Sequence, residues 1–421
     1  MSTPAHDLAG IRHTDLDAGL RVVTEAMPEL RSAAVGFWVG TGSRDERERL
    51  AGASHFLEHL LFKGTEERSA RAIAEAVESV GGEMNAFTTQ EYTAFYVRVP
   101  DEHLGLAVDV LSDITWRPAF RPDEVESERQ VILEEIRMRD DTPDDLVHEL
   151  FGEATFPGHP LGRQVLGSDE SIEAMRVADI AGYHAAHYTP GNIVVAAAGN
   201  VAHDDVVRLV EKGLPDNRDA RPARVLGGLR APEQLRVSRR PTEQAHIVLG
   251  TRALSRSDVD RHALSVLNQA FGGGMSSRLF QEIRERRGLA YSIFSYRIGF
   301  EETGALAVYA GTAPEHAHEV LTVLHGELDR LVADGLAEAE LEAAKGHLKG
   351  AMALGLESSS SRMHRLGRTE LVLGDIPTLD ELVAQVDAVT TEDIDRVIRR
   401  VVAEEPRILA VAGPFDAEDF A

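Results

Sequence analysis

The two halves of the chain repeat one order of predicted elements, and this repeat constrains the fold more than any other feature of the sequence. Residues 189–206 read as an apolar strand, then Ala-Gly, then an acidic turn, and residues 404–420 follow a similar order. Earlier in each half, an amphipathic helix leads to a glycine, an alternating strand and a second helix. We therefore expect two domains of the same fold.

The repeat also sets the expected domain boundaries. We predict an N-terminal domain over residues 1–212 and a homologous C-terminal domain over residues 235–421. The intervening residues 213–234 are rich in Pro, Gly and Arg without periodicity, which is typical of an exposed linker. Strands alternate with helices, but several strand pairs are consecutive. This order favours an α+β fold in which each domain has a mostly antiparallel β-sheet with helices packed on one face.

Composition excludes several classes of function. The chain has no cysteine, which rules out disulfides, thiolate metal sites and a cysteine nucleophile. Its formal net charge of −26 argues against nucleic acid or an anionic membrane as the main partner. No apolar run approaches the roughly 18 residues of a membrane span, and the first ten residues lack the pattern of a secretory signal. We therefore expect a soluble, cytoplasmic protein, in which any metal is held by His, Asp and Glu.

The strongest chemical signal is the segment His55-Phe-Leu-Glu58-His59, in a run of helical composition. Residues four apart lie within about 40° of each other around a helix, so both imidazoles project from one face, as zinc ligands must. Glu58 lies beside that face, where a carboxylate can accept a proton from water activated by a metal. This spacing is a known zinc-peptidase signature. The alternative is two ordinary hydrogen-bonded histidines, with Glu58 as a surface charge.

A catalytic zinc needs a third protein ligand, and the predicted helix over residues 121–141 offers one. Three apolar residues mark the buried stripe of this helix: Val125, Ile132 and Ile136. Glu134 falls opposite that stripe and should face solvent. Glu128 and Glu135 are seven residues apart and border the stripe on one flank, so either could be an inward-facing ligand. The alternative is that both carboxylates pair with Arg129 or Arg139 of the same helix.

Together, His55-x-x-Glu58-His59 and Glu135 in the segment ERQVILEEI resemble the pitrilysin/insulinase family of metallopeptidases, which includes the mitochondrial processing peptidase. Glu135 follows the second histidine at the distance that the family pattern requires. The resemblance implies that His55, His59 and Glu135 bind zinc and that Glu58 is the general base. It also implies that Glu128 orients a ligand histidine, which agrees with its stacking on Glu135.

The second half lacks this set of residues. Alignment of the two halves on Leu57 and Leu267 places Ser265, Asn268 and Gln269 opposite His55, Glu58 and His59. A second alignment, of Glu124-Val125 with Glu340-Leu341, places Ala344 and Ala351 opposite Glu128 and Glu135. We therefore expect one zinc ion per chain.

Residues 81–96 resemble the family's strand that receives the substrate, with Asn85, Ala86 and Thr88 in the matching places. Such a strand binds an extended peptide through its backbone groups. The alternative is an ordinary edge strand with polar alternation.

Residues 272–293 resemble the family's glycine loop, helix and following Arg…Gly-x-x-Tyr segment. The match implies that Arg284 and Tyr291 reach the bound peptide near the zinc and donate to its carbonyl oxygen. The alternative is that Arg284 is a solvated helix charge and Tyr291 a packed strand aromatic.

The resemblance covers essentially the whole chain and implies a zinc endopeptidase that cleaves extended or unfolded peptides inside a chamber. Relatives with two such domains usually pair two chains, and because this chain carries both residue sets, we expect a homodimer rather than a pair of unlike subunits. The alternative function is that of a non-catalytic relative, an assembly scaffold or peptide-binding chaperone, which normally lacks the complete ligand set. A metallohydrolase with another metal fits the two histidines and the glutamate chemically but has no further support.

Overall fold

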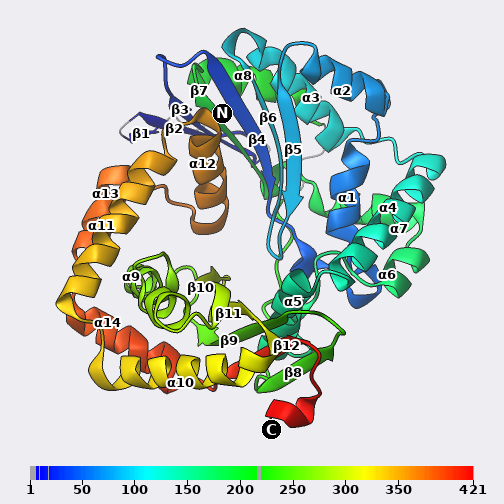
Figure 1. The fold of residues 1–421 in the computed structure, drawn as a ribbon. Coiled ribbons are helices and arrows are strands. Elements are labelled where there is room, and N and C mark those ends of the chain that lie inside the picture. The colour runs from blue at the N-terminus through cyan, green and yellow to red at the C-terminus, as the bar shows by residue number, and fades with distance from the viewer. Residues whose placement is uncertain (1–5, 9, 18, 216–219, 421) are drawn as a thin grey trace. The chain divides into compact units, whose positions relative to one another are not determined.

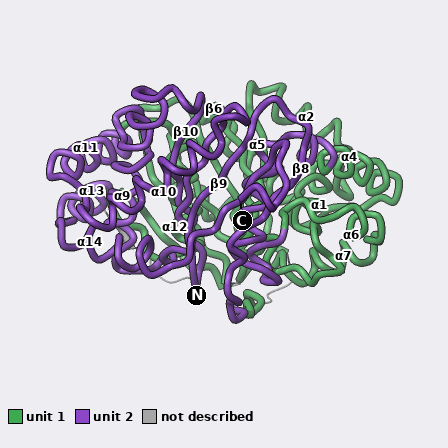
Figure 2. Tube along the Cα trace, turned by 60° about the horizontal axis from the view of Figure 1, so that its bottom comes forward, with its two compact units in different colours: residues 1–136, 164–225, 354–378 green, residues 137–163, 226–353, 379–421 purple. Residues whose placement is uncertain are grey.

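The protein is described by a computed structural model that covers residues 6–8, 10–17, 19–215 and 220–420 (Figure 1). Residues 1–5, within the segment tested for a secretory signal, and residues 216–219 of the predicted linker lie outside the described residues. The chain divides into two compact units, and each takes segments from both halves of the sequence (Figure 2). Unit 1 comprises residues 1–136, 164–225 and 354–378, and unit 2 comprises residues 137–163, 226–353 and 379–421. The domain boundaries expected from the sequence stay a prediction.

Unit 1 contains a seven-stranded sheet among its described residues, in the order β1-β2-β3-β7-β4-β6-β5. Its neighbouring strands are antiparallel except for the parallel pair β3–β7. The strands are β1 (His6–Leu8), β2 (Ile11–Asp15), β3 (Arg21–Ala26), β4 (Ser32–Val39), β5 (Glu83–Thr88), β6 (Thr93–Pro100) and β7 (Ile193–Gly199).

One face of this sheet packs against a layer of helices that share one apolar core with it. These helices are α1 (Ala53–Leu61), α2 (Ala70–Glu78), α3 (Leu104–Trp116), α4 (Pro122–Asp140), α6 (Asp169–Ala174), α7 (Val177–His187) and α8 (His203–Gly213).

Unit 2 contains a five-stranded sheet among its described residues, in the order β10-β11-β9-β12-β8. Again one pair, β12–β8, is parallel and the others are antiparallel. The strands are β8 (Leu235–Arg239), β9 (Ala245–Ala253), β10 (Ala290–Gly299), β11 (Gly304–Thr312) and β12 (Ile408–Gly413). The helices of its main core are α9 (Arg261–Gly272), α10 (Ala317–Asp334), α11 (Glu338–Gly355), α13 (Leu379–Asp387) and α14 (Thr391–Ile398), with π-helical turns at Phe280–Glu285 and Arg399–Ala403.

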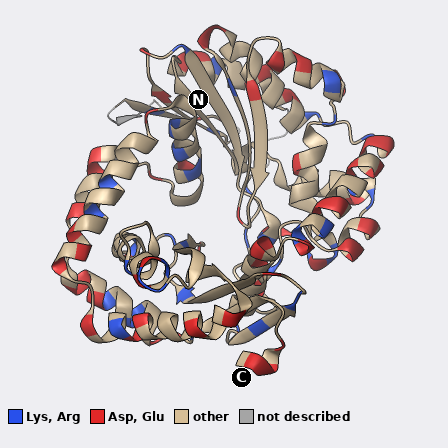
Figure 3. Ribbon diagram, in the orientation of Figure 1, with Lys and Arg blue, Asp and Glu red and all other residues tan. Residues whose placement is uncertain are grey.

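The two sheets share one topology. The strand order β3-β7-β4-β6-β5 of unit 1 corresponds to β8-β12-β9-β11-β10 of unit 2, with the parallel pair at the same place. Charged residues lie mostly on the helices, whereas the strands are mostly uncharged (Figure 3). The predicted α+β fold with two related, mostly antiparallel sheets is confirmed.

Each sheet also has one helix on its other face, contributed by the opposite half of the chain. Helix α12 (Ser359–Leu373) packs on the sheet of unit 1, and α5 (Pro143–Thr155) packs on the sheet of unit 2. The approach of α12 is close, because a Cβ added at Gly367 would lie 2.0 Å from Trp38 Nε1. The expectation of helices on one face is therefore incomplete, since it omitted these two helices. None of the helices in the described part of the chain combines the length and apolar character of a membrane span.

Candidate metal centre

Helix α1 presents His55 and His59 from its partly exposed flank, with their ring centroids 4.7 Å apart. The opposite face of α1 is anchored by side chains that are almost entirely buried, namely Phe56, Leu57, Leu60 and Leu61. Because these apolar residues fix how the helix is rotated about its axis, they also fix the direction of both imidazoles. The predicted shared face of the two histidines is present in the structure.

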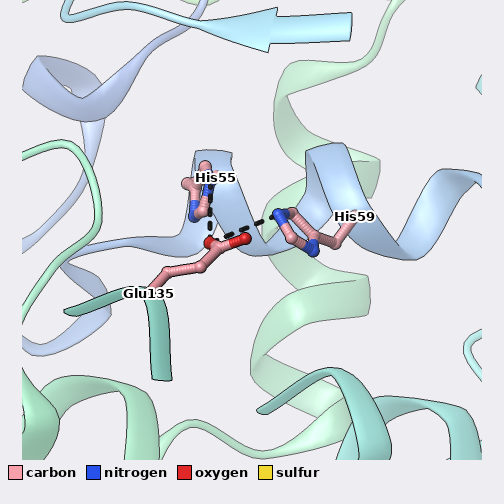
Figure 4. A group of neighbouring side chains, drawn as sticks. All are labelled: His55, His59 and Glu135. Atoms are coloured by element: carbon pink, nitrogen blue, oxygen red, sulfur yellow. Dashed lines mark ion pairs between the residues drawn. The ribbon is translucent and has the colours of Figure 1, made fainter. Parts of the chain in front are cut away.

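Glu135 on α4 completes a group of three possible metal ligands (Figure 4). Its Oε2 atom lies 3.6 Å from Nε2 of His55 and 3.6 Å from Nε2 of His59. Tetrahedral zinc ligands at their usual bond lengths stand about 3.3 Å apart, so this spacing fits a zinc ion. Oε2 is buried and has no hydrogen-bond partner among the described residues. Because a buried unpaired carboxylate oxygen is costly, a cation among these three atoms would stabilise the arrangement.

Both imidazoles are suited to binding a cation. Burial and the neighbouring His59 lower the pKa of His55 to about 3, so that its ring is neutral at neutral pH. Burial also lowers the pKa of His59, but the hydrogen bond with Glu128 and the charges of Glu135 and Glu58 raise it overall. The surroundings of His59 therefore favour positive charge, which a metal cation supplies.

Glu128 lies beside the three candidate ligands and forms a hydrogen bond with the ring of His59. Its Oε2 is 3.0 Å from Nδ1 of His59, and its Oε1 is 2.7 Å from Nζ of Lys63. Burial favours a raised pKa for Glu128, but the hydrogen bonds from His59 and Lys63 hold that pKa below its usual value. An ionised carboxylate can only accept, so Nδ1 of His59 donates and Nε2 faces Glu135. The positioning role implied for Glu128 fits this geometry.

The expected alternative for the two glutamates of α4 is wrong. Arg129 pairs with Glu126, and Arg139 pairs with Asp140, so neither arginine engages Glu128 or Glu135 in the structure. Glu134 is exposed, as the helical periodicity predicts.

Glu58 lies on α1 between the two histidines in sequence and makes a contact with the edge strand of the sheet. Thr88 at the end of β5 donates a hydrogen bond from Oγ1 to Glu58 Oε2, at 2.7 Å. Burial raises the pKa of Glu58 above its usual value, although the bond from Thr88 acts in the other direction. A raised pKa makes the carboxylate a stronger proton acceptor, as a general base requires.

Strand β5 contains Asn85, Ala86 and Thr88 and forms one edge of the unit 1 sheet, paired with β6. The other side of β5 has no strand partner among the described residues. An edge of this kind can accept an extended peptide as an added strand. That it does so here stays a prediction.

Arg284 and Tyr291 lie together in unit 2. The guanidinium carbon of Arg284 is 5.2 Å from the ring centroid of Tyr291 and 4.9 Å from that of Phe280. The side chain of Tyr291 is 80% exposed, so the alternative of a packed strand aromatic is wrong. The expected contact of both side chains with a bound peptide stays a prediction.

Two contacts of the site were not expected from the sequence. Lys63 follows His59 by four residues, a helical spacing that could have signalled their common side. The hydrogen bond between Thr88 of β5 and Glu58 of α1 joins two separate elements, and no local sequence pattern predicts it.

The chain is similar to known proteins over nearly its full length. A family model described as insulinase (peptidase family M16) matches residues 21–169, and one described as the peptidase M16 inactive domain matches residues 174–348. An uncharacterized zinc protease of Streptomyces coelicolor is 46% identical over 97% of this chain and 91% of its own length. Similar proteins of the same description are found in Mycobacterium tuberculosis (46% identical, 98% and 95% covered) and Bacillus subtilis (41%, 92% and 94%).

Solved structures share the fold. A protease from Helicobacter pylori matches with a TM-score of 0.88 and 24% identity over 96% of this chain and 99% of that one. A peptidase M16 inactive domain from Pseudomonas fluorescens matches with a TM-score of 0.88 and 21% identity over 97% and 98%.

Proposed function

The chain belongs to the insulinase family of peptidases, peptidase family M16, and from this membership we propose that it is a zinc-dependent endopeptidase. One observation carries the proposal. Oε2 of Glu135, buried and without a hydrogen-bond partner among the described residues, lies 3.6 Å from Nε2 of both His55 and His59. Two imidazoles and one carboxylate are the donor set of many catalytic zinc sites.

A zinc ion held by His55, His59 and Glu135 would supply the Lewis acidity that lets water act as a nucleophile at neutral pH. Glu58 accepts the proton of that water and passes it to the leaving amine. The hydrogen bond from Thr88 fixes Oε2 of Glu58, which leaves Oε1 for the proton. Glu128 keeps the ring of His59 in place through Nδ1.

The substrate of this proposal is an extended or unfolded peptide that lies along the edge of β5. Backbone hydrogen bonds to a strand edge carry little sequence information, so cleavage should show loose preference. In this proposal Arg284 and Tyr291 donate hydrogen bonds to the carbonyl oxygen of the bound peptide. Both side chains are hydrogen-bond donors, and both residues are exposed.

The proposal includes one zinc per chain, because the second half has no counterpart of the ligands. Helix α9 follows β9 as α1 follows β4, and its residues Ser265 and Gln269 occupy the places of the two histidines. We also infer a cytoplasmic homodimer, and a solution mass of two chains would support the dimer.

Zinc content and peptide cleavage together test the proposed function. The unaltered chain is expected to hold one zinc and to cleave a quenched-fluorescent unfolded peptide. Glu58→Gln should keep the zinc and lose at least a hundredfold in kcat, the usual contribution of a general base. Glu134→Gln, an identical change at an exposed position of α4, is the control and should leave both unchanged.

The outcomes separate the two functions considered. An unaltered chain without zinc, or full cleavage by Glu58→Gln, would overturn the peptidase proposal. A chain that binds the peptide and zinc but never cleaves would instead support a non-catalytic, peptide-binding relative.

A further inference from the structure

The helix that carries both histidines begins at a tightly constrained glycine. Gly52 has φ of +90°, a left-handed conformation that side chains rarely adopt. A Cβ added there would lie 2.6 Å from the carbonyl oxygen of Leu166 and 2.7 Å from Cδ1 of Ile172. The backbone turn that leads into α1 is therefore fixed at Gly52, because the neighbouring atoms leave no room for a side chain there.

A buried carboxylate closes this turn. Glu46 Oε2 accepts the backbone N–H of Gly52 at 2.8 Å, and Glu46 Oε1 accepts the backbone N–H of Ser54 at 2.7 Å. The first N–H groups of a helix have no acceptor within the helix, so each bond satisfies a donor that would otherwise be buried unpaired. The negative charge also lies at the positive end of the helix dipole. Glu46 is 5% exposed, so water cannot easily replace it.

The backbone next to Glu46 is fixed by the turn between β5 and β6. The N–H of Ser43 donates to the carbonyl oxygen of Thr89 at 3.1 Å, and that of Arg44 to the carbonyl oxygen of Gln90 at 2.9 Å. The guanidinium of Arg44 donates to Glu91 Oε1 at 2.5 Å, and both side chains are almost fully buried. These bonds fix the segment that carries Glu46 against the turn that follows Thr88, at the end of the edge strand β5.

Asp45, the residue before Glu46, is held from a different direction. Nε and Nη2 of Arg224 donate to its two carboxylate oxygens, each at 2.8 Å. Nη2 of Arg224 also donates to the carbonyl oxygen of Glu91 at 2.8 Å. The segment that carries Glu46 thus has little freedom to move along or away from α1.

This arrangement matters because the ligands come from two separate helices. Ser54 directly precedes His55, so its bond to Glu46 fixes the backbone next to the first ligand. The imidazoles of α1 must meet Glu135 of α4, and a metal site tolerates only about 0.5 Å or 10–20° of error in its ligands. A small rotation or slide of α1 would separate both Nε2 atoms from Glu135.

We propose that Glu46 is a positioning residue for the metal ligands, which sets the start and rotation of α1 through its two backbone hydrogen bonds. This inference rests on the proposed function, since zinc is the ion concerned. Glu46 has no role in proton transfer and acts through the backbone of α1.

The test is the zinc affinity of Glu46→Gln, measured by competition with a chelator while circular dichroism confirms folding. The amide keeps the shape of the side chain, but it has one acceptor and turns its NH₂ group toward the other N–H. We expect zinc to bind at least tenfold more weakly, because hydrogen bonds to a charged acceptor are stronger than those to a neutral one. Glu46→Asp keeps the charge and should recover part of the affinity.

Glu48→Gln is the matched control, because Glu48 lies two residues away on the same segment and is exposed. It should bind zinc within twofold of the unaltered chain. If the unaltered chain binds no zinc, the proposed function itself fails. If that chain binds zinc and Glu46→Gln binds it equally well, the positioning role alone is overturned. Should Glu46→Gln prove unfolded, an undiminished affinity in Glu46→Asp overturns the role, and a reduced affinity in that variant supports it.

Discussion

Glu149 gives the sharpest test of the electrostatics of unit 2. It lies on α5, the helix that the first half of the chain contributes to the second sheet. Burial raises the pKa of Glu149 to about 7; Arg139 acts against this rise, and the charges of Glu153 and Asp145 add to it. At neutral pH and above, the folded protein therefore carries a carboxylate that its surroundings disfavour.

The pH dependence follows from proton linkage. The folded protein keeps the Glu149 proton up to about pH 7, whereas the unfolded chain releases it near the ordinary value of 4.5. Stability is therefore unaffected by this group below about pH 4.5, falls as the pH rises from 4.5 to 7, and changes little above pH 7. The separation of the two pKa values corresponds to a loss of about 3 kcal/mol above pH 7. Glu149→Gln is neutral at every pH and should avoid this loss.

Hydrogen exchange of residues 143–155 measures the effect where it occurs. At pH 8, after correction for intrinsic rates, α5 of Glu149→Gln should exchange about a hundredfold more slowly than α5 of the unaltered chain, the ratio that about 3 kcal/mol implies. At pH 5 the two proteins should differ little. Glu134→Gln, on α4 of unit 1, should leave the exchange of α5 unchanged at both values. An equal ratio of the Glu149→Gln and unaltered rates at pH 5 and pH 8 would refute the reasoning.

Three further predictions concern the metal centre. Glu128→Gln removes the anionic acceptor of His59 Nδ1 and should weaken zinc binding about ten- to a hundredfold, as measured by competition with a chelator. Glu126→Gln, a change at an exposed position of the same helix, should leave zinc binding unchanged. Thr88→Val removes the hydrogen bond to Glu58 and should lower kcat about tenfold with zinc content unchanged, while Thr88→Ser restores the rate. Removal of zinc by a chelator should abolish cleavage and lower the melting temperature, both reversed by added zinc, because the ion binds the folded chain.

The arrangement of side chains in the candidate metal centre was largely predictable because its geometry is local. The spacing of His55 and His59 decides that they share a helix face, and the seven residues between Glu128 and Glu135 decide that these two stack on one flank. Helical periodicity could not divide their roles. The structure does so, because Glu135 reaches both Nε2 atoms while Glu128 reaches Nδ1 of His59.

The exchange of helices between the two halves could not be predicted from the sequence. Strand β7 is a continuous apolar run, a pattern typical of strands buried on both faces. The pattern shows that something must cover the second face, but not that α12, far along the chain, does so. Likewise, the composition of residues 213–234 indicates an exposed linker, yet the side chain of Arg224 is 8% exposed because it pairs with Asp45. Contacts between distant segments leave no local periodicity to detect.

The repeat explains how one half can keep the fold and lack the candidate metal centre. The apolar face of α1 packs into the core of unit 1, and the equivalent face of α9 packs into the core of unit 2, with Leu57 and Leu267 both fully buried. The candidate ligands His55 and His59 are not among the buried residues of α1, so Ser265 can stand where His55 stands at small cost to the core. Fold and chemistry are thus specified by different faces of one helix. Substitutions on the flank should therefore change zinc binding far more than they change the stability of the zinc-free chain, whereas substitutions at Leu57 should mainly lower that stability.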